Sequence, residues 1–148
     1  MIRLTCALLL LTTAVAGSGC QRGRYNPSKA TQPYPDQLHS NESVDIQVFR
    51  NDQKITLYNA TANSYHDFDV WINQRYVTHV DALPAGGRVK LSLWDFWDER
   101  GEVIDAGGIF RVYEPTPVRL VQIQMSETEP LIGLITIRDN DDFRQRGN

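Results

Sequence analysis

The chain reads VDIQVFRNDQKITL over residues 44–57, with apolar side chains recurring at every second position on both sides of Asn51-Asp52. A period of two residues predicts strands with one buried face, and an Asn-Asp pair favours a turn between them. Further strand signals, separated by turn residues, follow at residues 68–72, 89–93, 109–112, 118–125 and 131–137. No helical period interrupts this series. Residues 44–138 are therefore expected to form one all-β domain, a single antiparallel β-sandwich.

The residues at the ends of three of these strands, and the turn between two of them, indicate a narrower class of sandwich. One strand, Ile55–Asn59, ends in Asn, a second covers Asp69–Ile72, and Leu83-Pro84-Ala85-Gly86 precedes the strand that starts near Val89. This order resembles small exported immunoglobulin-like or fibronectin-like bacterial domains, which have about 100 residues. The resemblance implies an immunoglobulin-like fold and brings no catalytic residue with it, so it assigns no function by itself.

Composition limits the classes of function. The chain has 148 residues, 41% of them hydrophobic and 22% charged, which is typical of one folded domain. Lys and Arg total 15 against 18 Asp and Glu, a formal net charge of -3. Binding to nucleic acid needs clustered positive charge, so no nucleic-acid partner is expected. Two cysteines exclude a multi-disulfide scaffold and a Cys-rich zinc module.

The N-terminus has the organisation of an export signal. Arg3 precedes an uncharged apolar run over residues 4–16, which is too short to remain as a membrane-spanning helix, and Gly17-Ser18-Gly19-Cys20 follows. The Gly19-Cys20 ending resembles the lipobox of bacterial lipoproteins, although Gly17 stands where that family usually has an aliphatic residue. The resemblance implies that residues 1–19 are a lipoprotein signal peptide and that Cys20 carries the lipid, including palmitate.

This resemblance also implies a location. Gln21, rather than Asp, after the cysteine implies the periplasmic face of the outer membrane where the host has two membranes. An alternative remains, because Ala14-Val15-Ala16 is a site for ordinary signal peptidase, which would release a soluble periplasmic or secreted protein. Residues 20–43 contain three prolines and few aliphatic side chains and are expected to form a flexible, disordered linker; residues 139–148 form a polar tail.

The sequence contains no motif that is specific for a reaction or a bound metal ion. Spacing motifs for metal ligands and catalytic nucleophiles are missing from the sequence, so neither a metal site, nor a cofactor, nor enzymatic activity is expected. A metal site at His66, Asp67 and Asp69 is conceivable, but a solvated turn is the preferred interpretation. Five carboxylates lie close together in the sequence and could be considered for general acid–base catalysis, but an acidic surface loop is the preferred interpretation. They are Asp95, Asp98, Glu99, Glu102 and Asp105.

Aromatic residues are the most distinctive candidates for binding. Trp71 and Trp94 fall out of phase with the aliphatic faces of their strands, as does Tyr58, and Phe96 and Trp97 follow directly. If Asn73-Gln74 were a two-residue turn, Trp71 would face Tyr76 across the hairpin, but Gln suits a positive φ poorly and a longer loop remains open. Rings on the polar face of a sheet can stack on sugars or on a partner protein.

Three hypotheses follow from these features. The favoured one is a membrane-tethered, non-enzymatic interaction or structural module of the bacterial cell envelope, whose partner is an envelope protein. The second is a carbohydrate- or peptidoglycan-binding module that uses Trp71, Tyr76, Trp94 and Trp97. The third is a small envelope hydrolase built on the carboxylates between residues 95 and 105.

Overall fold

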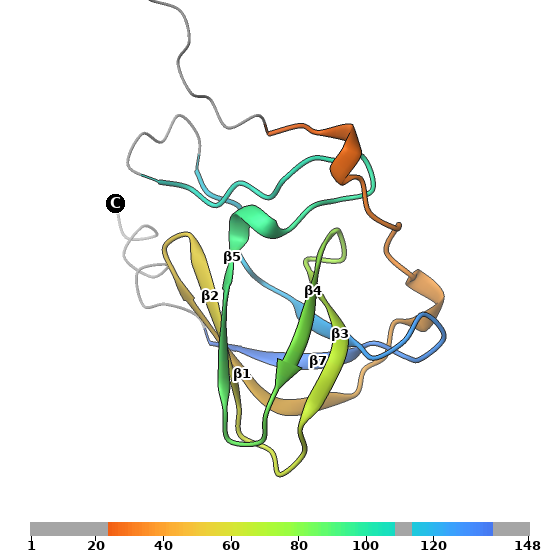
Figure 1. The fold of residues 1–148 in the computed structure, drawn as a ribbon, viewed down its shortest axis with the longest axis vertical. Helices are drawn as coiled ribbons and strands as arrows, with labels where there is room; N and C mark the ends of the chain where they lie inside the picture. The colour runs from red at the N-terminus through yellow and green to blue at the C-terminus, as the bar shows by residue number, and fades with distance from the viewer. Residues whose placement is uncertain (1–23, 109–113, 138–148) are drawn as a thin grey trace, which may run out of the picture.

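The computed structural model describes residues 24–108 and 114–137, and it is an all-β structure over that part of the chain (Figure 1). The seven strands are β1 Ser43–Asn51, β2 Lys54–Asn59, β3 Tyr65–Ile72, β4 Tyr76–Leu83, β5 Arg88–Ser92, β6 Val121–Gln124 and β7 Ile132–Ile137. The described residues also form three single-turn 3-10 helices: η1 Pro27–Lys29 and η2 Asp36–Leu38 before β1, and η3 Leu93–Asp95 after β5. Within the described ranges, no helix has the length and apolar character needed to cross a membrane.

The strands form one mixed sheet in the order β4-β3-β6-β7-β1-β2-β5. Every neighbouring pair is antiparallel except β1 and β7, which run parallel, so the expectation of a purely antiparallel sheet is wrong at this pair. The parallel register shifts between Val44 and Gln47. The long strand β1 pairs with β7 on one side and β2 on the other, and the sheet curls around the main core (Figure 1).

Alternating side chains build that core as the sequence pattern predicted. Ile46 and Val48 of β1 are fully buried, as are Ile55 and Leu57 of β2. Six of the seven strands contribute buried residues to the same cluster, and the seventh, β5, packs partly buried residues against it. Burial of one such aliphatic side chain contributes about 1.5–3 kcal/mol. The predicted strand at residues 109–112 lies outside the described residues.

The β3–β4 hairpin has a three-residue turn. Ile72 pairs with Tyr76, and Trp71 pairs with Val77, so the pairing of Trp71 with Tyr76 is wrong and the longer loop is correct. Asn73 and Gln74 both have positive φ, at 51° and 57°. Asn73 stabilises the turn because its side-chain oxygen accepts hydrogen bonds from the backbone N–H groups of Arg119, at 2.9 Å, and Leu120, at 3.2 Å.

Residues 24–42, here called the N-terminal segment, lie along the outer surface of the sheet instead of forming the expected free linker. Tyr34 and Leu38 pack on a second small cluster formed by Trp71, Val77 and Leu131. The Tyr34 and Trp71 rings meet edge to face, with their centroids 5.4 Å apart. An apolar patch around a buried tryptophan thus orders a segment whose own composition carries few aliphatic side chains.

Three hydrogen bonds also fix this segment to the domain. The Tyr34 hydroxyl donates to Gln122 Oε1 at 2.8 Å, and the Leu131 N–H donates to the Leu38 carbonyl at 2.8 Å. At its other end, the Asn26 N–H donates to the Gly101 carbonyl at 2.7 Å. Gly101 has φ +79° and a Cβ there would lie 2.3 Å from the Asn26 carbonyl oxygen, so the close approach requires glycine.

Candidate functional site

The four aromatic residues predicted to bind a ligand do not form a shared surface. Trp71 is fully buried and Tyr76 is 8% exposed, while Trp94 and Trp97 are half-buried. Two of the indole N–H groups donate hydrogen bonds within the protein: Trp71 Nε1 donates to Gln124 Oε1 at 3.1 Å, and Trp94 Nε1 donates to Gln53 Oε1 at 2.7 Å. The out-of-phase position of Trp71 marks the second cluster beneath the N-terminal segment rather than an exposed stacking platform.

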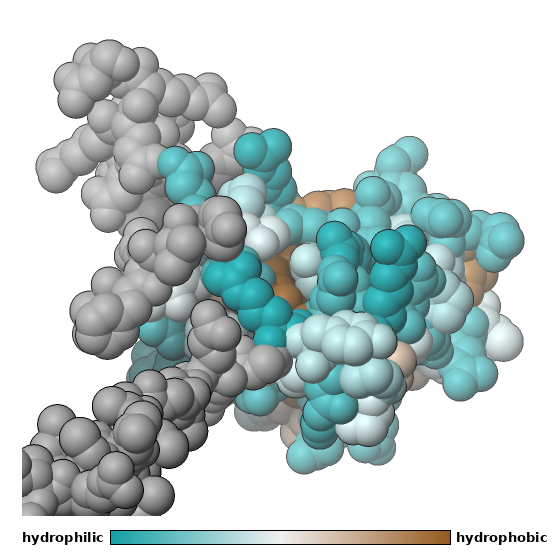
Figure 2. All heavy atoms as spheres, turned by 90° about the horizontal axis from the view of Figure 1, so that it is seen from above, coloured by the Kyte–Doolittle hydropathy of each residue, from teal (hydrophilic) through white to brown (hydrophobic). Residues whose placement is uncertain are grey.

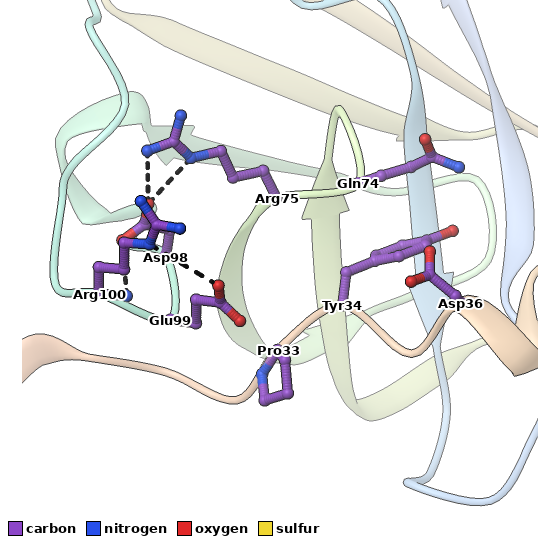
Figure 3. A pocket seen from close by; sticks show the side chains of 8 residues that line it. All are labelled: Pro33, Tyr34, Asp36, Gln74, Arg75, Asp98, Glu99 and Arg100. Carbon is purple, nitrogen blue, oxygen red and sulfur yellow. Dashed lines mark hydrogen bonds and ion pairs between the residues drawn. The ribbon is translucent and has the colours of Figure 1, made fainter.

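A polar hollow of about 420 Å³ lies where the N-terminal segment, the β3–β4 turn and the loop after η3 meet (Figure 3). Viewed from this end of the molecule, the surface is mostly hydrophilic, with hydrophobic residues visible only in small areas (Figure 2). The side chains that line the hollow are those of Pro33, Tyr34, Asp36, Gln74, Arg75, Asp98, Glu99 and Arg100.

Asp98 is the structural centre of this hollow. Its carboxylate is 1% exposed and accepts two hydrogen bonds from Arg75, at 2.9 Å from Nε and 2.7 Å from Nη2 (Figure 3). Its other oxygen accepts from the backbone N–H groups of Arg100, at 3.0 Å, and Glu102, at 2.7 Å. Burial alone would raise the pKa of Asp98, but these hydrogen bonds and the Arg75 charge outweigh it, so the pKa lies below its usual value.

The predicted acidic loop is held by ion pairs. Arg75 bridges Asp98 and Glu102 with Nη2, and its guanidinium lies 4.9 Å from the centre of the Tyr76 ring. Asp105 pairs with Arg24 at 2.9 Å. A general acid needs a raised pKa, whereas that of Asp98 is lowered, and the side chains lining the hollow include no Ser, Cys or His. These contacts organise the loop and hold Asp98 in its ionised form.

A different surface gathers large exposed hydrophobic side chains. Phe49 of β1, Tyr58 of β2, and Ile135 and Ile137 of β7 are 40–43% exposed. Strand register places them together, because Gln47 pairs with both Tyr58 and Ile135, and Phe49 pairs with Ile137. We call this surface, defined by Phe49, Tyr58, Ile135 and Ile137, the outer apolar face.

Cations border the outer apolar face on the side of β5. Arg88 pairs with Tyr58 in the ladder between β5 and β2, and Lys90 pairs with Thr56; both cations are exposed. Sequence reasoning noticed Tyr58 as out of phase but missed the other three apolar residues. The sequence did show apolar side chains at strand positions where the alternation predicts polar, outward-facing residues. It does not show that β1 pairs with β7, and that pairing brings Ile135 and Ile137 next to β1.

Cys20, the predicted site of lipidation, lies outside the described residues. Among the described residues, Asp67, His79 and Asp81 of the β3–β4 hairpin could hold a metal ion, and they are separate from the outer apolar face. Comparison of the chain with family models, with curated proteins and with solved structures finds no match.

Proposed function

We propose that this chain is a membrane-tethered, non-enzymatic interaction module of the bacterial cell envelope, and that the outer apolar face binds its protein partner. One observation carries the proposal. Among the described residues, four of the five large hydrophobic side chains that are strongly exposed lie on this one face, and only Tyr25 lies elsewhere. Exposed apolar side chains that gather on one face and are bordered by polar and charged residues are typical of a protein-binding site.

The strand order supports an immunoglobulin-like sandwich as the scaffold. β3, β4, β6 and β7 form one group of hydrogen-bonded neighbours, β2 and β5 form another, and β1 joins the two. In this interpretation the N-terminal segment covers the outer surface of the first group around Trp71, while the outer surface of β2, β1 and the end of β7 remains available. The export signal and Cys20 support attachment of this module to the envelope membrane through lipid.

Burial of Trp71 and Tyr76 makes the glycan-binding alternative less favourable. A stacking platform needs the face of a ring to be accessible, and these two residues are half of the four that the alternative requires.

Site-specific photo-crosslinking in the host tests the proposal. A photoreactive amino acid placed at Phe49 or Ile135 should crosslink the same envelope protein, whereas one placed at Tyr25, which is 62% exposed and away from the face, should not. A Phe49→Ser variant should weaken capture of that protein by at least tenfold, since truncation of a hot-spot residue costs about 2 kcal/mol or more and about 1.4 kcal/mol corresponds to a factor of ten.

The lipid is tested separately with Cys20→Ala. Loss of membrane attachment in this variant supports the tether, and unchanged attachment contradicts it. Crosslinks of equal intensity from Tyr25 and Phe49, or no specific product from Phe49 and Ile135, would contradict the assignment of the outer apolar face.

A further inference from the structure

The outward surface of the β3–β4 hairpin carries a compact group of one imidazole and three carboxylates. Asp67 and Asp69 on β3, and His79 and Asp81 on β4, alternate with core residues of the same strands. Asp69 pairs directly with His79 in the ladder. The pairs on either side of Asp67, His66 with Ala82 and Phe68 with Val80, place Asp67 across from Asp81. Two carboxylates opposed in this way repel each other unless a cation lies between them.

The imidazole is held in one orientation by its neighbours. His79 Nδ1 lies 3.0 Å from Asp69 Oδ1, and the other oxygen of Asp69 accepts a hydrogen bond from Gln32 of the N-terminal segment at 3.2 Å. A carboxylate on one ring nitrogen is the arrangement that histidine ligands of metal ions usually show, since it fixes the tautomer and leaves the other nitrogen as the donor. The donor atom here is His79 Nε2.

Nε2 faces the two remaining carboxylates. It lies 4.0 Å from Asp67 Oδ1 and 3.9 Å from Asp81 Oδ1, and one ligand atom from each of the three residues lies within 4.8 Å of the others. Around a tetrahedral ion with bonds of about 2.1 Å, ligand atoms are roughly 3.4 Å apart. All three side chains are largely exposed, so small rotations about their side-chain bonds can close this difference.

We propose that Asp67, His79 and Asp81 bind a divalent transition-metal ion, with Zn²⁺ the best match, and that Asp69 positions His79. One imidazole nitrogen and two carboxylate oxygens are a donor set suited to Zn²⁺, and three protein ligands leave a fourth position for water. The ion would neutralise the opposed carboxylates and connect β3 to β4. The site is independent of the proposed binding to a partner, because it shares no residue with the outer apolar face.

Calorimetric titration of the untagged full-length protein with Zn²⁺, after treatment with a chelator, tests the proposal. The expected result is saturable binding of one ion per chain to this group. His79→Ala should lower the affinity at least tenfold, and Asp69→Ala should lower it 10–100-fold although it leaves the three ligands in place.

His66→Ala is the matched control, because His66 is an exposed histidine on the same hairpin and lies outside the group. It should keep the affinity of the unmodified protein. A rise in melting temperature with Zn²⁺ should also occur in the unmodified protein and in His66→Ala, but not in His79→Ala. Absence of saturable binding, unchanged affinity in His79→Ala, or an equal loss in His66→Ala would overturn the site.

Discussion

Asp98 illustrates how the fold controls the chemistry of one side chain. The carboxylate is buried, and four hydrogen bonds from Arg75 and two backbone N–H groups surround it. Such an arrangement stabilises the ionised form and makes Asp98 a structural anchor of the loop that borders the polar hollow.

Substitution of this anchor should reduce stability in a manner that depends on pH. Asp98→Asn should lower the free energy of unfolding by about 2 kcal/mol near pH 7, because hydrogen bonds to a charged group are stronger than those to a neutral one. The folded-state pKa of Asp98 is lowered, so its contribution is present above the unfolded pKa of about 3.9 and disappears as the pH falls through the folded value. Urea unfolding at pH 7 and pH 3 should therefore show a smaller difference between the two proteins at pH 3.

Asp36→Asn is the control for this measurement, because Asp36 lines the same hollow but is exposed. It should change stability by less than about 0.5 kcal/mol. An equal difference between wild type and Asp98→Asn at both pH values would show that the charge of Asp98 is not what stabilises the loop.

At the scale of secondary-structure elements, the N-terminal segment depends on its contact with β3. Tyr34 lies edge to face against Trp71 and donates a hydrogen bond to Gln122, a buried polar residue of β6. Tyr34→Ala should lower the free energy of unfolding by about 2–4 kcal/mol, since it removes a large half-buried ring and leaves Gln122 without this donor.

Tryptophan fluorescence checks the same variant directly. Exposure of Trp71 should shift the emission to longer wavelength and increase quenching by acrylamide. Tyr25→Ala should leave both signals unchanged, because Tyr25 lies in the same segment but is mostly exposed. If Tyr34→Ala also left them unchanged, the segment would not be what shields Trp71.

Local alternation accounts for the part of the fold that the sequence predicted. Apolar residues two positions apart, such as Ile46 and Val48 or Ile55 and Leu57, predict strands because neighbouring residues of one strand point to opposite faces. The parallel pairing of β1 with β7 has no such local signal, since it joins segments separated by most of the domain. For the same reason the sequence could not predict that Phe49 and Ile137 would be neighbours.

The candidate sites also combine local features that the sequence shows with contacts between distant segments that it does not show. Trp71 was conspicuous because it broke the phase of its strand, but the residues that cover it, Tyr34 and Leu38, belong to a segment whose composition predicts a linker. The group at His79 was missed because its ligands come from two strands, and only the hairpin register brings Asp67 and Asp81 to the same imidazole. The metal site considered at His66, Asp67 and Asp69 shares two carboxylates with the group proposed here, but it has His66 in place of His79.

At the scale of the whole molecule, the two ends of the sheet are not equivalent. The described chain enters beside the loop that contains Gly101, and the turn between β4 and β5 lies at the opposite end (Figure 1). With the lipid on Cys20, the entry end should face the membrane.

Fluorescence quenching by labelled lipids tests this orientation. In membrane-attached protein, a dye at position 100 should be quenched more strongly than a dye at position 85, because Arg100 lies in the loop beside the entry point and Ala85 is exposed in the β4–β5 turn. Equal quenching at the two positions would contradict a fixed orientation.

The packing of the N-terminal segment also limits how far the folded domain can lie from Cys20. Four residue steps separate Cys20 from Arg24, whose carbonyl already accepts a hydrogen bond from Val103. A fully extended chain of that length spans about 14 Å, so a domain anchored at Cys20 has almost no freedom to move away from the bilayer. A free linker through residue 43 would have let the domain search a wide volume for partners. With Cys20 lipidated, as we propose, the ordered segment would instead confine the domain to a thin layer at the membrane surface, and the partner would have to come to that layer.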